Sequence, residues 1–129
     1  MTCLVHSSER LIIVKIGETF VANVYFPDLS ARDRDLIICD ICNQIEHYVH
    51  CNADTPIIVG GDFNSKFVGG HSNSTDLDNF MTTNKLISCD HKFPSNTTYT
   101  YWHDARHCGS WTDHFIVSDN IYIYIYITK

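Results

Sequence analysis

The sequence lacks any long uninterrupted apolar segment and is poor in basic residues. A helix that crosses a bilayer needs about 20 consecutive apolar residues, so we expect no transmembrane helix and no membrane partner. Nine Lys and Arg residues stand against 15 Asp and Glu residues, which gives a formal net charge of -6. Non-specific adhesion to a polyanion is therefore disfavoured, because phosphate binding is driven largely by Lys and Arg. Metal-assisted chemistry on phosphates is not excluded, because a bound cation offsets the carboxylates that hold it.

The N-terminus also lacks the charged start and apolar block of a secretory signal peptide. We therefore expect an intracellular protein, nuclear or cytoplasmic, whose six cysteines are free thiols. A chain of 129 residues is long enough for one domain with a core and too short for two. We expect that domain to cover residues 1–120. Residues 121–127 alternate Ile and Tyr, so we expect residues 121–129 to be a low-complexity, β-prone tail.

The order of apolar runs and breaks predicts an α/β (α+β) fold. Strands are expected at 10–16 and 19–26, joined as a hairpin through Gly17 and Glu18. An N-cap signature at Ser30 and apolar residues at helical spacing predict a helix over 31–50. A strand follows it, and strand, helix and strand are typical of a helix packed on a sheet. Further along we expect a loop at 65–75 and a short helix at 76–84. Extended segments are expected at 86–87, 98–102 and 111–117.

Residues 56–64, Pro-Ile-Ile-Val-Gly-Gly-Asp-Phe-Asn, are the most informative stretch. They predict a buried strand that stops on two glycines, where the backbone can turn sharply. On an extended backbone the side chains of Asp62 and Asn64 leave from the same face. A carboxylate beside an amide is suited to holding a water and a phosphate oxygen. The alternative is an ordinary turn, since Asp and Asn are common turn residues, and this stretch alone does not separate the two.

Three segments stand in an order that is recognisable: 24–28 (Val-Tyr-Phe-Pro-Asp), 61–64 (Gly-Asp-Phe-Asn) and the pair 98–102 with 110–118. Together they resemble the endonuclease/exonuclease/phosphatase superfamily, and within it the apurinic-type endonuclease domains of non-LTR (LINE-like) retrotransposons. The resemblance covers residues 8–120. It implies a partial four-layer αββα sandwich, shortened at both ends, in which two sheets pack between outer helices and half of one sheet is missing.

The resemblance implies a DNA endonuclease that hydrolyses phosphodiesters with a divalent cation, Mg²⁺ or Mn²⁺. By that resemblance Asp62 would orient or deprotonate the attacking water, and Asn64 would hold that water and a phosphate oxygen. Both residues would also be metal ligands, and Tyr25 would contact the scissile phosphate. Such groups are needed because a phosphodiester resists attack until its charge is neutralised and the water is aimed. DNA is the implied partner, and the resemblance allows a reverse transcriptase in the same parent polypeptide.

Asp113 can be matched to two different aspartates of that family. Thr112-Asp113-His114 invites comparison with the closing Ser-Asp-His motif. The whole segment 111–118, however, matches an earlier strand that has an aspartate near its start and a serine at its end. We therefore assign Asp113 to the earlier catalytic aspartate. On this assignment we expect His114 to be a strand residue with no catalytic role.

Parts of the family's site then have no counterpart in this sequence. The terminal Asp-His pair is missing, and Glu9, Glu18 and Glu46 lie in the wrong context to replace the family's metal-binding Glu. Asp28 stands where the family prefers Asn. A hard cation needs several oxygen ligands at once, so we expect weak metal binding and little or no cleavage. The alternatives are a non-catalytic remnant or binding module and, within the superfamily, a phosphatase.

A different metal site can be read from a group of cysteines and histidines: Cys39, Cys42, His47, His50 and Cys51. Cys39 and Cys42 would lie one turn apart on the predicted helix, whereas structural zinc sites more often present such a pair from a turn. Because free cysteine is among the most buried residues, we favour a packing role. The polar residues at 103–109 are expected to be an exposed connection.

Overall fold

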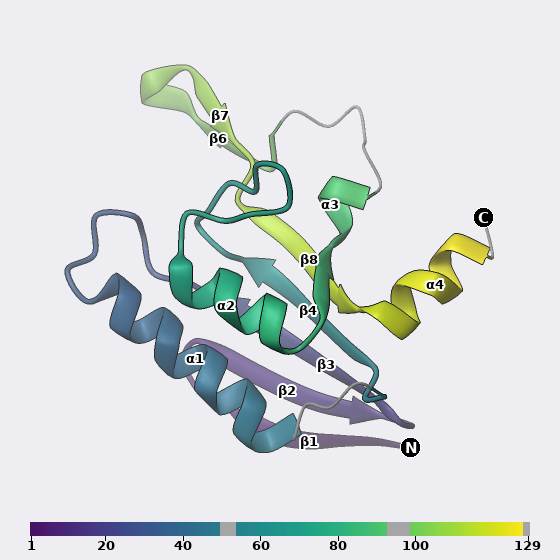
Figure 1. Cartoon of the computed structure of the whole chain (residues 1–129). Helices are drawn as coiled ribbons and strands as arrows, with labels where there is room; N and C mark the ends of the chain where they lie inside the picture. Colours follow the sequence, from purple (N-terminus) through teal and green to yellow (C-terminus); the bar gives the residue numbers. More distant parts are fainter. Residues whose placement is uncertain (50–53, 93–98, 128–129) are drawn as a thin grey trace.

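The computed structural model describes residues 1–49, 54–92 and 99–127 (Figure 1). Six strands form one mixed sheet in the order β1-β2-β3-β4-β8-β5, and a two-stranded hairpin, β6-β7, projects from one end of it. The strands are β1 (Thr2–Ser7), β2 (Leu11–Ile16), β3 (Thr19–Tyr25), β4 (Ile57–Asp62), β5 (Leu86–Ser88), β6 (Tyr101–His103), β7 (Cys108–Ser110) and β8 (Asp113–Ser118). The helices are α1 (Arg34–Val49), α2 (Thr75–Thr83), α3 (Cys89–Lys92), α4 (Asp119–Ile127) and a 3₁₀ turn, η1 (Asp104–Arg106).

The order of elements confirms the predicted α/β (α+β) class. β2 and β3 form the expected antiparallel hairpin, and Gly17 takes a positive φ of 59° in its turn. β3 and β4 are parallel, so α1 is the crossover between them, whereas β8 runs antiparallel to β4. β1 is an additional strand on the sheet edge, antiparallel to β2. Its side chains are exposed or half-buried throughout, so its sequence carries no alternating apolar pattern.

Helices α1 and α2 cover one face of the sheet (Figure 1), and the core lies between them and the strands. Paired residues such as Leu11 and Val24, or Ala22 and Val59, share that covered face. The residues exposed by no more than 1% that lie in the strands and helices are Leu11, Ile13, Val24, Ile38, Ile45, Ile57, Val59, Leu77 and Ile116. Within the described residues no helix covers the other face, where Ile12, Ile16 and Phe115 are 42%, 49% and 59% exposed.

Two local predictions were wrong. Helix α1 begins at Arg34 and not at residue 31, because the carboxylate of Asp28 accepts hydrogen bonds from the N–H and the hydroxyl of Ser30 and makes a separate turn. The β-prone residues after 118 form helix α4, and Asp119 and Asn120 belong to its first turn. A helix satisfies its own backbone hydrogen bonds, so these residues need no partner strand.

The expected domain boundary after residue 120 stays a prediction. No helix in the described ranges is both long enough and apolar enough to cross a membrane.

Gly61 provides a test of the β4 backbone. Its φ is +134°, and a Cβ atom there would collide with the carbonyl oxygen of Val24 in β3. We expect Gly61→Ala to lower the free energy of unfolding by about 3 kcal/mol, since backbone strain and a steric clash add. The measurement is urea denaturation of the full chain.

Gly69→Ala is the matched control, because Gly69 also has a positive φ (+59°) but no heavy atom within 4 Å of the added methyl. It should lose only the strain of a left-handed residue, about 1 kcal/mol. Equal losses in the two variants would contradict the predicted clash.

Candidate active site

Three of the predicted site residues meet at one end of the sheet. Tyr25 ends β3, Asp62 ends β4 and Asp113 begins β8. The register pairs Tyr25 with Asp62 across the parallel strands and Asp62 with Asp113 across the antiparallel strands. Directly paired residues of neighbouring strands project from the same face of a sheet. The three side chains therefore stand in a row on the face opposite the helices.

A cleft of about 820 Å³ lies over this corner and is lined by all four predicted residues. Its walls come from the segment after β3, the turn after β4 and the β6-β7 hairpin. The lining residues are Tyr25, Asp28, Leu29, Ser30, Asp62, Asn64, Thr100, Tyr101, His103, Arg106, Cys108, Ser110, Thr112 and Asp113. The sequence thus predicted the residues that come together, although they are far apart along the chain.

The turn that carries Asp62 and Asn64 is anchored by the residue between them. Phe63 is fully buried, and its ring packs edge-on against Phe26 at 5.0 Å between ring centroids. An Asp62 carboxylate oxygen accepts the N–H of Asn64 at 2.8 Å, and Asn64 has a left-handed φ of 43°. The expected extended backbone is therefore wrong at Asn64, and the turn reading of this stretch is right. The turn nevertheless keeps both side chains in the cleft.

The side chain of Asn64 is oriented by a second hydrogen bond. Its amide nitrogen, Nδ2, donates to the carbonyl oxygen of Phe26 at 2.8 Å. This bond uses the donor end of the amide and leaves the oxygen, Oδ1, available to a ligand in the cleft.

The carboxyl group of Asp62 is electrostatically perturbed. Burial raises its pKa above the usual value, the nearby Asp113 carboxylate adds to the rise, and the N–H of Asn64 and the charge of Arg34 oppose it. Burial and a like charge both disfavour the ionised form. A raised pKa makes the Asp62 carboxylate a stronger base, and a cation bound near both aspartates would offset their repulsion.

Arg34 ties together the two loops that carry the site. Its side chain is buried, with Nη1 donating to the carbonyl oxygen of Pro27. Nη2 donates to the carbonyl oxygen of Asn64 at 3.1 Å and to the hydroxyl of Ser65 at 2.7 Å. Burial lowers the pKa of the Arg34 guanidinium, and the carboxylates of nearby aspartates oppose that change. The planar guanidinium thereby fixes the loop after β3 relative to the turn after β4.

His114 lies behind the site and does not line the cleft. Its ring is buried, with Nδ1 in contact with the carboxylate of Asp90 and Nε2 2.6 Å from the carbonyl oxygen of Ser65. The Phe67 ring packs edge-on against it, with 4.5 Å between the centroids. His114 therefore supports the turn after β4 from the core side. The absence of a direct catalytic role stays a prediction.

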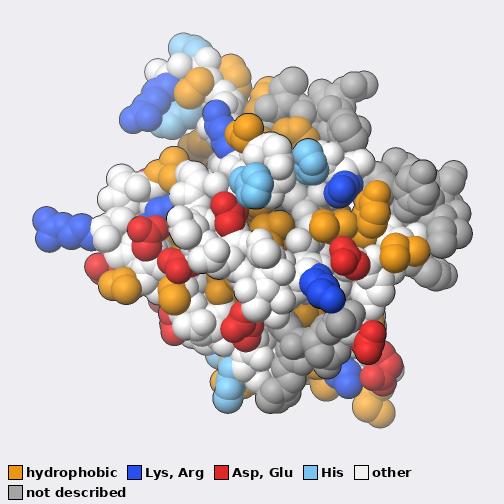
Figure 2. All heavy atoms as spheres, viewed as in Figure 1, with side chains coloured by type: hydrophobic (Ala, Val, Ile, Leu, Met, Phe, Trp, Pro, Cys, Tyr) orange, Lys and Arg blue, Asp and Glu red, His pale blue; other side chains and the backbone are white. Residues whose placement is uncertain are grey.

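The β6-β7 hairpin contributes residues that the sequence reading treated as an exposed connection. His103 and Arg106 line the cleft, and Figure 2 shows blue and pale-blue basic side chains on the projecting hairpin. The hairpin is joined to the sheet near Thr112, whose N–H donates to the hydroxyl of Thr100 at 3.0 Å. Its strands have only three residues each, which is too short for a sequence pattern of alternating apolar and polar residues. An Arg within a hairpin next to an acidic cleft can contact a phosphate.

The side chains in the cleft match the ligand preference of a hard cation. Asp62 and Asp113 offer carboxylates and Asn64 offers an amide oxygen, and Mg²⁺ is typically held by one or two carboxylates, waters and substrate phosphates. No group of three His, Cys, Asp or Glu side chains suited to a metal ion is found in the part of the chain that the structure describes. Glu9, Glu18 and Glu46 lie outside the cleft lining. The residues present fit an Mg²⁺ whose remaining ligands are waters and a substrate phosphate.

The alternative zinc site receives no support from Cys42. Its side chain is buried in the core on α1, and burial raises the pKa of its thiol to about 12. Cys42 belongs to the hydrophobic core cluster, which agrees with the packing role that we favoured for it. His50 and Cys51 lie outside the described residues.

Comparison with known proteins agrees with the motifs. A family model described as endonuclease-reverse transcriptase matches residues 19–128. The fold is similar to an AP endonuclease from Archaeoglobus fulgidus, with a TM-score of 0.56 and 17% identity over 92% of this chain and 58% of that one. It is also similar to the endonuclease domain of TRAS1, a telomere-specific non-LTR retrotransposon, with a TM-score of 0.56 and 12% identity over 86% of this chain and 51% of that one.

These identities are low, so the two structures establish the fold and no more. They confirm the predicted sandwich class. The described residues form one six-stranded sheet with helices on one face, and beside it only the two-stranded β6-β7 sheet, so the expected half of a second packed sheet is not seen among them. The chain spans 51–58% of the length of the two structures. A search of curated protein sequences gives no match.

The row of carboxylates predicts a pH effect. Asp113→Asn removes a like charge from the neighbourhood of Asp62, so the pKa of the Asp62 carboxyl should fall toward its usual value. The midpoint of its titration should move to lower pH, measured by ¹³C NMR of labelled Asp carboxyl groups. Asp104→Asn, in η1 and outside the cleft lining, should leave that midpoint unchanged. If the titration midpoint of Asp62 is the same in the Asp113→Asn variant and in the unaltered chain, the two carboxyl groups do not interact.

Arg34 gives a second test of the site's framework. Arg34→Met leaves the carbonyl oxygens of Pro27 and Asn64 without their donor, so the free energy of unfolding should drop by about 3 kcal/mol. Arg32→Met removes an equal charge from an exposed position two residues earlier and should change stability by less than about 0.5 kcal/mol. Urea denaturation of both variants measures the difference. Similar losses would mean that the guanidinium does not join the two loops.

Proposed function

Because the chain belongs to the endonuclease-reverse transcriptase family, as the motifs around Tyr25, Asp62 and Asp113 predicted, we propose that its cleft binds a DNA phosphodiester together with a divalent cation. The observation that carries the proposal is the row of Tyr25, Asp62 and Asp113 on one sheet face, with Asn64 beside it. These side chains can surround a single phosphate. A non-LTR retrotransposon origin is part of the proposal, and a reverse transcriptase segment in the parent polypeptide is the partner that the origin implies.

Each side chain has a task that its surroundings support. Asp62 would orient the attacking water and accept its proton, because its carboxylate lies in the cleft at the end of β4. Asn64 would offer its amide oxygen to that water and to the cation. Tyr25 is 51% exposed, with the Arg10 guanidinium 5.1 Å from the centre of its ring, so its hydroxyl is free to donate to a phosphate oxygen. Asp113 completes the negative charge that attracts the cation.

Asp62 and Asn64 would hold the cation, with Asp113 close by. Bound Mg²⁺, or Mn²⁺ in its place, supplies positive charge that neutralises the phosphate and favours ionisation of a water. The metal-binding Glu that the resemblance implies has no counterpart among the residues that line the described cleft. We therefore propose that this chain cleaves DNA slowly, and the same limitation supports the alternative of a module that binds phosphodiesters without cleaving them. A phosphatase shares the same chemistry, and the match to a retrotransposon-type family favours the nuclease.

Plasmid nicking tests the proposed activity. With Mg²⁺ or Mn²⁺ the full chain should nick supercoiled DNA, and Asp62→Ala should slow nicking at least about 100-fold, because a general base typically contributes that much. Glu18→Ala is the matched control, since it removes one carboxylate from an exposed turn at the opposite end of the β2-β3 hairpin. It should nick like the unaltered chain.

Mn²⁺ broadening of amide NMR signals is the companion measurement. Signals near Asp62, Asn64 and Asp113 should broaden first, and Asp62→Ala should abolish this selectivity. Selective broadening without nicking would favour the binding module. Equal nicking by Asp62→Ala and Glu18→Ala would refute the catalytic proposal.

A further inference from the structure

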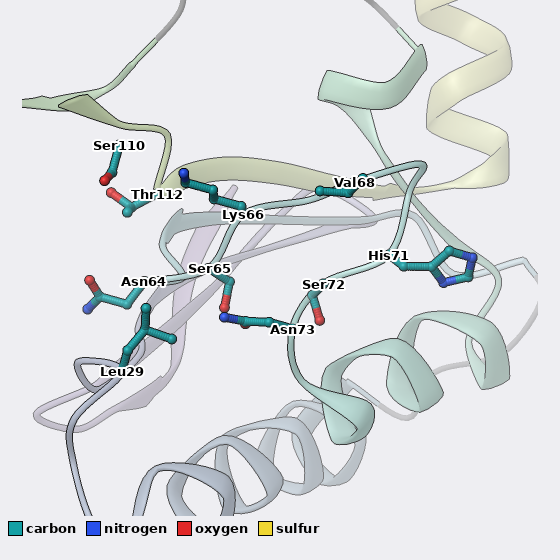
Figure 3. Close-up of a pocket in the computed structure, with 10 residues that line it drawn as sticks. All are labelled: Leu29, Asn64, Ser65, Lys66, Val68, His71, Ser72, Asn73, Ser110 and Thr112. Carbon is teal, nitrogen blue, oxygen red and sulfur yellow. The ribbon is translucent and has the colours of Figure 1, made fainter. Parts of the chain in front are cut away.

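A second cavity, of about 530 Å³, opens beside the cleft (Figure 3). Leu29, Asn64, Ser110 and Thr112 line both spaces, so the two are adjacent and share these side chains. Sites for small ligands typically have volumes of about 300–1,000 Å³, so this cavity is large enough for one further group of a substrate.

The charge of this cavity differs from that of the cleft. Asp28, Asp62 and Asp113 line the cleft, whereas the described lining of the cavity includes no carboxylate. Its one lysine, Lys66, is exposed and forms no ion pair within the described residues. Figure 3 shows the Lys66 amine on the side of the cavity where the hydroxyls of Ser110 and Thr112 lie. The Lys66 ammonium and the Ser110 hydroxyl are donors suited to a phosphate, whereas the Thr112 hydroxyl donates to a carboxylate oxygen of Asp113 at 3.4 Å.

The cavity also has apolar walls. Leu29 and Val68 line it with side chains that are 63% and 76% exposed. A ligand that matches both kinds of surface carries an anionic phosphate and an apolar ring face, which is the combination found in a nucleotide.

The loop that carries Lys66 is fixed in place by buried polar contacts. The Ser65 hydroxyl accepts a hydrogen bond from Arg34 at 2.7 Å, and its carbonyl oxygen contacts the ring of His114. At the far end of the loop the N–H of Ser72 donates to a carboxylate oxygen of Asp78, in α2, at 2.7 Å. Because the loop is already ordered, little conformational entropy is lost when a ligand binds there.

We propose that this cavity is a subsite for the nucleotide next to the scissile phosphate, with Lys66 binding the flanking phosphodiester. The subsite rests on the proposed function of the neighbouring cleft, because it extends the same substrate strand. The cation at Lys66 also explains how a chain with a net charge of -6 holds a polyanion next to three aspartates.

The test compares two probes that differ in the number of phosphates. Thymidine 5′-monophosphate has one phosphate, and the trinucleotide d(TpTpT) has two phosphodiesters, so only the trinucleotide can place one phosphate in the cleft and a second one at Lys66. With Mg²⁺ present, the unaltered full chain should bind d(TpTpT) about tenfold more tightly, by NMR titration. Lys66→Gln should remove that gain and leave monophosphate binding unchanged. It should also reduce the slope of log K against log salt by about 0.7, the value for one contact to a single strand.

Lys15→Gln is the matched control, since it removes one positive charge from β2, outside both spaces. It should bind both probes like the unaltered chain. If Lys66→Gln and Lys15→Gln weaken trinucleotide binding equally, the effect is long-range charge and the subsite is refuted.

The amide signals separate this proposal from the one it rests on. Signals of Asp62, Asn64 and Asp113 should respond to both probes, and those of Lys66 and His71 should shift further with the trinucleotide, because only its second phosphate reaches Lys66. A response confined to the cleft residues would overturn the subsite and leave the proposed function standing. Failure of both probes to move any of these signals would overturn both.

Discussion

The register of β4 against β3 and β8 is the constraint on which the site depends. Ile57 and Val59 are buried under the helices, and side chains alternate along a strand, so Asp62 must project from the opposite face. A slip of one residue would turn Asp62 into the core and Ile58 out of the helix-covered face, which burial of the apolar set forbids. The same pairing places Tyr25 and Asp113 on either side of Asp62. The position of the carboxylates therefore follows from burial of the core.

Beyond the end of β4 the backbone is held by buried polar side chains and by Phe63. Arg34 donates a hydrogen bond to the carbonyl oxygen of Asn64, and the Nε2 atom of His114 contacts the carbonyl oxygen of Ser65. A buried polar group is costly unless it is hydrogen-bonded, and here each of these two side chains contacts more than one partner. Because the partners lie on different loops, the cleft and the cavity beside it share one framework.

The parts of the fold that follow a local pattern could be predicted from the sequence. The hairpin of β2 and β3 and the helix α1 show clear periodicity, and the resemblance of the motifs around Tyr25, Asp62 and Asp113 to a known family identified the residues that meet. The contacts of Arg34, and the position of Lys66 in one cavity with Ser110 and Thr112, could not be predicted, because they join segments far apart in sequence. α4 escaped prediction for another reason, since the intrinsic preference of alternating Ile and Tyr is for strand and only the surrounding structure makes it helical. The boundary at residue 120 and the chemical roles of the four site residues remain predictions.

The sheet face opposite the helices has a consequence for the behaviour of the protein in solution. Ile12, Ile16 and Phe115 leave apolar surface in water, and each square ångström of it forgoes about 25 cal/mol of hydrophobic stabilisation. The stability of the fold comes mainly from the sheet face that the helices cover. The tendency to aggregate depends on the opposite face, where Ile12, Ile16 and Phe115 are exposed. Changes that make the protein more soluble and changes that make it fold more firmly should therefore map to different residues.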